Sequence, residues 1–255
     1  MRVIVTRPQS EAQEWVRELR QRGFDAVAIP LIVISPAPRP AEVAAAWVGL
    51  PGCRAAMFVS GNAVRGFFAS RPATMDWPSD LRGWATGNGT RRALLAAGVE
   101  PALVDSPPSG STQFDSETLW QLVAGQVRAG DRVLIVRGGE AASDGVGRDW
   151  LAEQLLAAGA RVQTAVAYLR APPEASRLQL AVERQAAGAG GVWVFSSSQA
   201  IANLATLLPG QDWTKCRAVA THPRIVQTAR DAGFGVVCES RPSLDAVTSA
   251  LESFR

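Results

Sequence analysis

Met57-Phe58-Val59-Ser60-Gly61-Asn62-Ala63-Val64 is the stretch that decides the fold. An apolar run ends in a hydroxyl residue, a glycine and an amide, and apolar residues then return at helical spacing. This pattern predicts a buried strand, a tight turn and a helix start. Such a turn presents backbone N–H groups and the positive end of a helix dipole, which suits an anionic group. A second stretch, Val194-Phe195-Ser196-Ser197-Ser198-Gln199-Ala200-Ile201, aligns with the first without a gap.

Strands alternate with helices along the rest of the chain, and proline-rich segments interrupt the pattern at 35–40 and 172–173. A Gly/Thr-rich turn is expected at Thr86-Gly87-Asn88-Gly89-Thr90. Besides the strands that precede the two serine turns, the sequence predicts strands at Val3–Val5, Ala26–Ile34, Leu81–Ala85, around Leu103, at Arg132–Val136, Val162–Leu169, Ala218–Ala220 and Val236–Val237.

The two halves of the chain resemble each other. The segment 2–7 matches 132–137, Gly23 matches Gly159, and Ala85-Thr86 with Gly98 matches Ala220-Thr221 with Gly233 at the same internal spacing. Each half reads strand, helix, strand, proline-rich break and three further strand-helix units. The sequence therefore predicts an α/β protein with two flavodoxin-like, doubly wound parallel-sheet domains.

A proline-rich break after the second strand of each copy is explained if the chain crosses between domains at both breaks. The first domain then takes residues 1–35 plus 171–255, and the second takes 36–170. Connectors near 33–40 and 166–173 would form a two-stranded connector beside a cleft. The alternative is two tandem domains that divide near Gly130.

Composition excludes several classes of protein. The 255 residues are 47% hydrophobic and 19% charged, without an apolar run long enough for a membrane span, and the chain opens directly on a strand, so a cytoplasmic protein is expected. The net charge of +3 comes from dispersed arginines, which gives no indication of nucleic-acid binding. Cys53, Cys216 and Cys238 lack metal or disulfide spacing and are expected to be buried free thiols. His222 is the only histidine, so neither a Ser-His-Asp triad nor a metal site is expected.

Ligands of open α/β sheets bind at the carboxyl ends of the strands, where this chain places hydroxyls, amides, glycines and arginines and almost no carboxylates. This surface suits an anion, although each turn alone is more often a plain helix cap. Neither a full GxGxxG nor a P-loop is present, so a dinucleotide site is not expected. The candidate binding residues are Thr6, Arg7, Ser60, Gly61, Asn62, Thr86, Gly87, Asn88, Thr90, Arg137, Gly138, Ser196, Ser197, Ser198, Thr221 and His222.

Tyr168 is the only tyrosine and ends the predicted strand Val162–Leu169. Its phenol either packs the hinge between the domains or faces the cleft and donates a proton to a leaving hydroxyl. His222 directly follows a strand and is either a local helix cap or a residue that faces the cleft.

The pattern as a whole resembles the uroporphyrinogen-III synthase family over essentially the full length. The segments that carry the resemblance are Val5-Thr6-Arg7-Pro8, Ile29-Pro30-Leu31-Ile32, Phe58-Val59-Ser60-Gly61-Asn62-Ala63-Val64, Ala85-Thr86-Gly87-Asn88-Gly89-Thr90, Val133-Leu134-Ile135-Val136-Arg137-Gly138, Val166-Ala167-Tyr168 and Ala218-Val219-Ala220-Thr221-His222-Pro223-Arg224. Many relatives have Gly-Pro-Thr-Thr after the strand that here ends at Ala220, so the hydroxyl of that turn would come from Thr221 or be replaced by His222.

The resemblance implies a cofactor-free, monomeric enzyme that cyclises the linear tetrapyrrole hydroxymethylbilane to uroporphyrinogen III, with loss of water and inversion of ring D through a spirocyclic intermediate. It implies that backbone amides and hydroxyls in the cleft hold the substrate's carboxylates, that Ser60, Thr90 and the Ser197 turn lie in that cleft, and that Tyr168 assists the loss of the hydroxyl. Transient contact with hydroxymethylbilane synthase is a further expectation, and no nucleic acid or membrane is expected as a partner.

Two other functions fit the residues alone. A non-enzymatic binding protein with two α/β lobes would share the cleft but would not need Tyr168. A sugar-phosphate or nucleotide enzyme on the same scaffold predicts a carboxylate or lysine among the strand-end turns, and only Glu140 and Asp144 follow such a turn.

Overall fold

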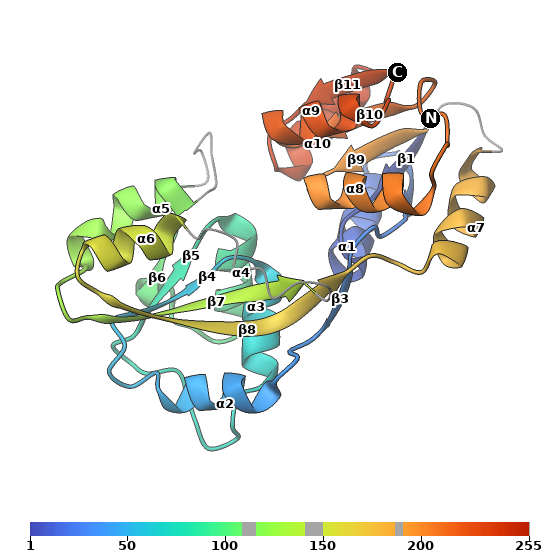
Figure 1. Cartoon of the computed structure of the whole chain (residues 1–255). Coiled ribbons are helices and arrows are strands. Elements are labelled where there is room, and N and C mark those ends of the chain that lie inside the picture. The colour runs from blue at the N-terminus through green and yellow to red at the C-terminus, as the bar shows by residue number, and fades with distance from the viewer. Residues whose placement is uncertain (109–115, 141–149, 187–190, 255) are drawn as a thin grey trace. The chain divides into compact units, whose positions relative to one another are not determined.

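The computed structural model describes residues 1–108, 116–140, 150–186 and 191–254 (Figure 1). The chain separates into two compact units: unit 1 is Met1–Val33 with Ala171–Arg255, and unit 2 is Ile34–Arg170. Both units are α/β with parallel strands, and the chain passes from unit 1 to unit 2 and back. The predicted fold class is therefore confirmed.

Unit 1 holds a five-stranded sheet of order β11-β10-β9-β1-β2, in which every neighbouring pair is parallel. Numbered along the chain, its strands follow the order 2-1-3-4-5 that is typical of flavodoxin-like sheets. Its elements are β1 (Arg2–Val5), α1 (Gln9–Gln21), β2 (Asp25–Ala28), α7 (Ala175–Ala186), β9 (Val192–Phe195), α8 (Ser198–Leu207), β10 (Arg217–Ala220), α9 (Pro223–Asp231), β11 (Val236–Glu239) and α10 (Leu244–Glu252).

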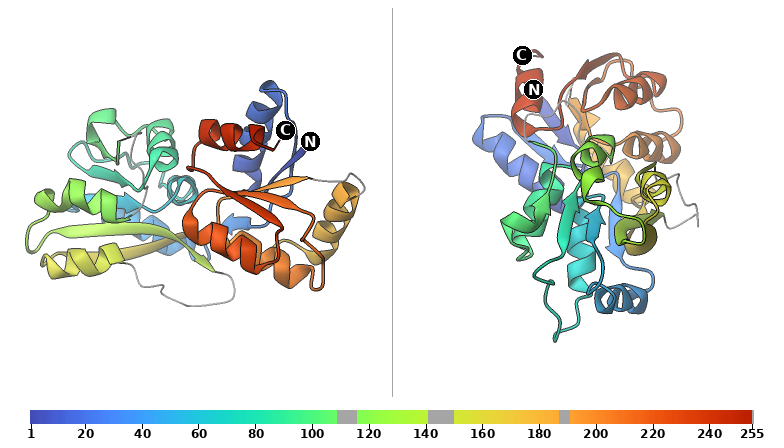
Figure 2. Two further views of the ribbon diagram at one scale, coloured as in Figure 1. Left: turned by 90° about the horizontal axis from the view of Figure 1, so that it is seen from above. Right: turned by 90° about the vertical axis from the view of Figure 1, so that its left-hand side faces the viewer.

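Helices cover both faces of this sheet (Figures 1 and 2). Val3 and Val5 point to the face covered by α1 and α10, where Trp15, Leu19 and Val247 complete a buried cluster. Because successive strand residues face opposite ways, Ile4 and the aromatic residues of β9 pack on the other face, which α8 and α9 cover.

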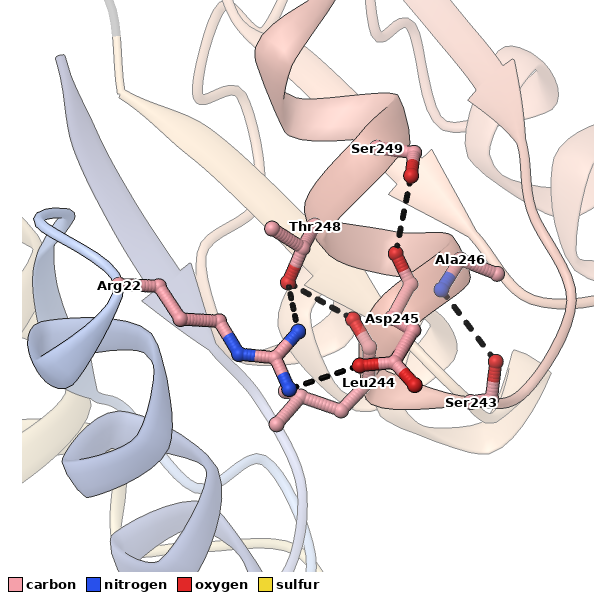
Figure 3. Close-up of polar contacts among 7 residues, drawn as sticks. All are labelled: Arg22, Ser243, Leu244, Asp245, Ala246, Thr248 and Ser249. Carbon is pink, nitrogen blue, oxygen red and sulfur yellow. Dashed lines mark hydrogen bonds and ion pairs between the residues drawn. The ribbon is translucent and has the colours of Figure 1, made fainter.

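A polar cluster ties the two separate segments of unit 1 together (Figure 3). Arg22, at the end of α1, forms an ion pair with Asp245 at 2.7 Å and donates a hydrogen bond to the hydroxyl of Thr248 at 3.1 Å, both on α10. Ser243 caps α10 by accepting a hydrogen bond from the Ala246 N–H. Residues far apart in the sequence are thus joined within one unit.

Unit 2 holds a sheet of order β3-β8-β7-β4-β5-β6. When strands are counted from β7, the five from β8 to β6 also follow the order 2-1-3-4-5. Each unit therefore takes its first two strands from one half of the chain and its last three from the other half. The elements are β3 (Val33–Pro36), α2 (Pro40–Val48), β4 (Ala55–Phe58), α3 (Gly61–Ala69), β5 (Arg82–Ala85), α4 (Asn88–Ala96), η1 (Pro101–Leu103), β6 (Val104–Asp105), α5 (Ser116–Val123), η2 (Ala124–Gln126), β7 (Arg132–Glu140), α6 (Trp150–Ala157) and β8 (Arg161–Ala171).

The sheet of unit 2 is also covered on both faces. Helices α2, α3 and α4 pack on one face around Trp47, which stacks on Phe67 with ring centroids 4.7 Å apart and donates its indole N–H to the Phe67 carbonyl. Helices α5 and α6 pack on the other face over Ile135 and Trp84. The turns that follow the strands are therefore held by two filled cores.

Two predicted elements differ from the structure, and a third, the strand predicted around Leu103, begins one residue later. The strand expected over Ala26–Ile34 is two strands, β2 and β3, separated at residues 29–32, where Leu31 is hydrogen-bonded through its N–H to the Thr6 carbonyl and through its carbonyl to the Asn203 amide. The turn expected at 86–90 is shorter, because α4 begins at Asn88. Around Leu103 the chain forms the 3-10 turn η1, and the strand that follows it, β6, has only two residues.

Other expectations have plainer outcomes. The cysteines are free, as predicted, but they are only partly buried. Burial nonetheless raises the pKa of the Cys53 and Cys216 thiols. The sequence also predicts loops at 106–111 and 139–147. Gly139 and Glu140 belong instead to β7, and residues 109–111 and 141–147 lie outside the described residues. Within the described part of the chain, no helix is long and apolar enough to cross a membrane.

Candidate functional site

Unit 2 gathers a set of polar residues where β4 and β5 end side by side, next to the point at which β7 passes the end of β4 and continues with β8 alone. Ser60 caps α3, whose first residues are Gly61 and Asn62, and Gly87 precedes α4, which begins at Asn88. The two helix starts pack together, since a Cβ on Gly61 would lie 3.6 Å from the Gly89 carbonyl oxygen. Two helix N-termini thus present their positive ends at one edge of the sheet.

Ser60 connects one of these helix starts to Tyr168. Its hydroxyl accepts a hydrogen bond from the Ala63 N–H at 3.1 Å and lies 3.1 Å from the hydroxyl oxygen of Tyr168, with either oxygen able to donate. Tyr168 is only 5% exposed, and its ring packs in the core cluster beside Ala167. The phenol is therefore held in one position by packing and by a polar partner.

Arg137 brings a cation to the same edge of the sheet. It ends the regular part of β7, is partly buried, and its buried Nε donates no hydrogen bond within the part of the chain that the structure describes. An arginine just past the end of the β4/β7 pairing and beside two helix N-termini favours an anionic ligand, because a buried guanidinium N–H without an acceptor is costly.

Of the other predicted residues of unit 2, Asn62 and Thr86 have partners within the fold and Thr90 is buried. The Asn62 side-chain oxygen accepts a hydrogen bond from Arg65 at 2.7 Å, and the Thr86 hydroxyl donates to the Val59 carbonyl at 3.2 Å. Thr90 is only 5% exposed in the first turn of α4. A ligand at this edge would therefore meet backbone N–H groups more readily than these three side chains.

Unit 1 places a second set of predicted residues at the ends of β1, β9 and β10, which are also neighbours. Thr6 is 1% exposed and its hydroxyl donates to the Val194 carbonyl at 2.7 Å. The Arg7 guanidinium lies 4.0 Å above the Trp15 ring and forms an ion pair with Glu11. Thr6 therefore holds β1 to β9, and Arg7 is fixed over α1.

The remaining residues of unit 1 lie at helix starts. Ser197 precedes α8, and its hydroxyl makes no cap hydrogen bond, whereas Ser198 accepts a hydrogen bond from Thr228. His222 is exposed and caps α9, with Nδ1 accepting from the Arg224 N–H at 3.1 Å. Thr221 is 7% exposed. His222 thus has the capping role that was one of the two roles predicted for it. Ser196 and Ser197, which follow the neighbouring strand β9, are partly exposed.

The structure reveals polar residues that sequence reasoning missed. Asn203 on α8 is 7% exposed and donates to the Leu31 carbonyl at 2.8 Å, while it accepts from Gln199 at 2.9 Å. The available signal was a Gln-x-x-x-Asn pair on a helix whose other inward positions are apolar. Neither residue lies at a strand end, so the strand-end rule did not select them.

Together these features define an α/β protein of two flavodoxin-like units, each with polar turns and helix N-termini at the ends of its strands. Among the described residues, no group of three or more His, Cys, Asp or Glu is placed to hold a metal ion. The chemistry on offer consists of backbone N–H donors, hydroxyls, a partly buried guanidinium and one fixed phenol.

Comparison with known proteins identifies the family. The family model described as "Uroporphyrinogen-III synthase HemD" matches residues 13–249, so the chain belongs to the uroporphyrinogen-III synthase family. The uroporphyrinogen-III synthase of Escherichia coli (strain K12) is 29% identical over 259 residues, which cover 99% of this chain and 100% of that protein.

Two solved structures share the fold. A mutant uroporphyrinogen III synthase from the extremely thermophilic bacterium Thermus thermophilus aligns with a TM-score of 0.58 at 19% identity and covers 100% of this chain and 97% of its own. The uroporphyrinogen-III synthetase of Helicobacter pylori 26695 aligns with a TM-score of 0.58 at 18% identity over 100% of both chains. At these identities the likeness establishes the fold alone.

Proposed function

We propose that this chain is an enzyme that cyclises hydroxymethylbilane to uroporphyrinogen III, with loss of water and inversion of ring D. The family assignment supports the class of enzyme. The observation that carries the proposed reaction is the fixed phenol of Tyr168, 3.1 Å from the Ser60 hydroxyl at the end of β4, at an edge of the sheet that suits anions.

The substrate is a polycarboxylate, so it needs several anion sites. The helix N-termini behind Ser60 and Gly87 supply backbone N–H donors, and Arg137 supplies a cation whose buried Nε has no acceptor among the described residues. We propose that the serine turn at Ser196–Ser198 and the turn at Thr221 supply further donors from unit 1. Neither set requires a cofactor or a metal.

The proposed reaction begins at the terminal hydroxymethyl group. The pyrrole nitrogen pushes its electron pair toward the carbon that bears the hydroxyl, the C–O bond breaks, and Tyr168 gives its proton to the departing oxygen, which leaves as water. The resulting azafulvenium carbon is attacked by ring D at its substituted α-carbon, which forms the spirocyclic intermediate. The bond between the attacked α-carbon and the methylene carbon shared with ring C then breaks, so that ring C now carries the azafulvenium. The unsubstituted α-carbon of ring D attacks that methylene carbon and closes the macrocycle with ring D inverted, and loss of the proton of this α-carbon to the tyrosinate restores the aromatic pyrrole and the phenol.

Holding the linear chain in a reactive fold accounts for most of the task. The azafulvenium ion forms readily once the hydroxyl is protonated, and it cyclises without help to the isomer in which ring D is not inverted. The enzyme therefore has to orient the ends of the chain more than it has to supply strong acid or base groups. This agrees with a candidate site rich in N–H donors and hydroxyls.

The test is a product analysis. Purified protein is given freshly prepared hydroxymethylbilane, the products are oxidised to porphyrins, and the type I and type III isomers are resolved by chromatography. We expect the type III isomer with the protein and the type I isomer in a parallel reaction without it. Type I alone in both reactions would overturn the proposal and return the chain to the class of binding proteins for anionic small molecules.

A further inference from the structure

Three residues of unit 2 lie in a row across three neighbouring strands. The last paired residues of β4 and β7 are Phe58 and Val136, so Ser60 and Gly138, each two positions further on, come level with each other. On the other side of β7, Gly138 is opposite Tyr168 of β8. The order across the sheet is therefore Ser60, Gly138 and Tyr168.

The phenol of Tyr168 reaches Ser60 by crossing over Gly138. Neighbouring strands lie about 4.8 Å apart, so the side chain has to span the whole of β7 to reach the end of β4. A Cβ added to Gly138 would lie 2.7 Å from Cε2 and 2.8 Å from the hydroxyl oxygen of Tyr168. Real side chains do not approach so closely, so any residue larger than glycine at 138 would occupy the space of the ring.

A β-bulge brings Tyr168 to this position. The ladder between β7 and β8 pairs Arg137 with Val166 and then Gly138 with Tyr168, which leaves Ala167 as an extra residue on β8. In a regular ladder Gly138 would be opposite Ala167 instead. Bulges of this kind re-aim the side chain that follows them.

A second glycine accommodates the bulge. The carbonyl of Ala167 points at α3, and a Cβ on Gly66 would overlap its oxygen and lie 3.0 Å from its carbon. Ala167 is fully buried, so the carbonyl cannot turn away into solvent. Gly66 thus allows α3, the helix that Ser60 caps, to lie directly against the bulge.

We infer that Gly138 and Gly66 are positioning residues, an inference that rests on the proposed role of Tyr168. Gly138 leaves room for the phenol of Tyr168 to lie across β7 and meet the Ser60 hydroxyl, and Gly66 leaves room for the carbonyl of the bulge residue Ala167 that precedes Tyr168. Gly138 then acts on the reaction through Tyr168 and is not a substrate contact. Each glycine is thus explained by the space that a side chain would occupy, Gly138 by the ring of Tyr168 and Gly66 by the carbonyl of Ala167, and not by backbone flexibility.

The kinetic test compares two alanine variants on one strand. Gly138→Ala displaces the phenol, and we expect kcat for formation of the type III isomer to fall by about a hundredfold with KM little changed, since misplacement of a reacting group by about 1 Å has an effect of that size. Gly139→Ala is the matched control: its Cβ would meet the side chains of Leu169 and Val166 at 3.0 Å and the Tyr168 carbonyl oxygen at an ordinary 4.0 Å, but not the ring, so its kcat should stay near that of the wild type. Equal kcat values in the two variants would overturn the inference.

A spectroscopic test reports on position directly. Because Tyr168 is the only tyrosine, protein labelled with [13Cζ]tyrosine gives one phenol resonance. We expect Gly138→Ala to shift this resonance and Gly139→Ala to leave it in place. An unmoved resonance in Gly138→Ala would contradict the inference even if activity were lost.

A rescue variant covers the case in which Gly138→Ala does not fold. Tyr168→Leu removes the ring, so the double variant Gly138→Ala/Tyr168→Leu should fold again, whereas a double variant that stays unfolded would overturn the assignment of this space to the ring. The resonance and rescue tests are independent of the product. Failure of the wild type to make the type III isomer would therefore end the proposed function, while an active wild type with an unmoved resonance in Gly138→Ala would end only this inference.

Discussion

The two units share the strand order 2-1-3-4-5, and the strand numbered 2 differs most in length between them. In unit 1 this strand, β2, has four residues, and the chain leaves the ladder after Ala28. In unit 2 its counterpart, β8, has eleven residues and continues through a bulge to Ala171. Ile32 follows Gly23 by the same nine residues that separate Tyr168 from Gly159, so the two positions correspond.

These two ends are fixed by different interactions. In unit 1, Leu31 is held by the Thr6 carbonyl at 3.2 Å and by the Asn203 amide at 2.8 Å, just before the chain leaves the unit. In unit 2, the corresponding end carries a phenol across Gly138 to Ser60. Both strand ends thus lie just before the chain leaves its unit, and in unit 2 the end also carries, we propose, a reacting group.

Replacing the corresponding residues of the two strands tests this comparison most severely. Tyr168→Phe removes only the hydroxyl, and we expect kcat to fall by about 10²–10⁴-fold, the usual contribution of a general acid. The matched variant in unit 1, Ile32→Val, removes one methylene from a residue that is 6% exposed. It should lower the free energy of unfolding by about 0.5–1.5 kcal/mol and leave kcat unchanged.

The measurement is single-turnover formation of the type III isomer, with thermal unfolding of each variant as a check on folding. Near-normal turnover in Tyr168→Phe would assign the phenol to packing, which its burial in the core cluster also fits. A loss of turnover in Ile32→Val as large as that in Tyr168→Phe would mean that both strand ends act on the reaction and that the two units do not differ as described.

Asn203→Ala tests the hydrogen bonds at the strand end of unit 1. The variant leaves the Leu31 carbonyl without its donor in a buried place, which costs about 1–3 kcal/mol. Gln199→Ala is the control, because it removes the other partner of Asn203 and keeps the bond to Leu31. Hydrogen exchange of the peptide that contains Leu31 should accelerate in Asn203→Ala only, and equal acceleration in both variants would contradict the assigned role.

The sequence predicted the sheets better than it predicted the ends of the strands. Apolar periodicity and the internal match were enough for two parallel α/β sheets, because both depend on local patterns that recur. The break after Ala28 was missed, because the partners that hold Leu31 there, the Thr6 carbonyl and the Asn203 amide, are remote in the sequence and no local pattern marks them.

The candidate site divides in the same way. Sequence reasoning selected Ser60 and Tyr168 separately, one from a turn signal and the other as the only tyrosine. Their hydrogen bond depends on the bulge at Ala167, and no pattern in the sequence marks that bulge. Gly138 was selected as a candidate binding residue because it follows a predicted strand, and no pattern in the sequence showed that the ring of Tyr168 lies beside it.

An arginine–aspartate pair joins neighbouring strands in each unit. We expect replacement of these arginines to have smaller effects than the substitutions above. Arg82 binds Asp105 through two nitrogens, and the two side chains are 27% and 12% exposed, whereas Arg2 and Asp25 are 43% and 56% exposed. Arg82→Lys keeps the charge but loses the two-nitrogen contact with Asp105, so it should lower the free energy of unfolding by about 1–2 kcal/mol. Arg2→Lys should stay within about 0.5 kcal/mol.

Urea denaturation followed by tryptophan fluorescence measures both variants of these pairs, since each unit has a buried tryptophan cluster. If the units unfold in separate transitions, only the transition of unit 2 should move in Arg82→Lys. Equal shifts in the two variants would mean that burial of the pair has no bearing on its strength.

The serine turns at Ser60 and Ser197 give the smallest expected difference in stability between the two units. Ser60→Ala removes the acceptor of the Ala63 N–H and should cost about 1 kcal/mol, whereas Ser197→Ala removes a hydroxyl without a cap hydrogen bond and should cost only a few tenths of a kcal/mol. Ser60→Asn is the control, because its side-chain oxygen can cap α3 again without reproducing the hydroxyl that meets Tyr168. We expect low turnover in both Ser60 variants, because both lack the hydroxyl that meets Tyr168, but recovery of stability in Ser60→Asn. Recovery of both stability and turnover in Ser60→Asn would show that Ser60 serves α3 alone.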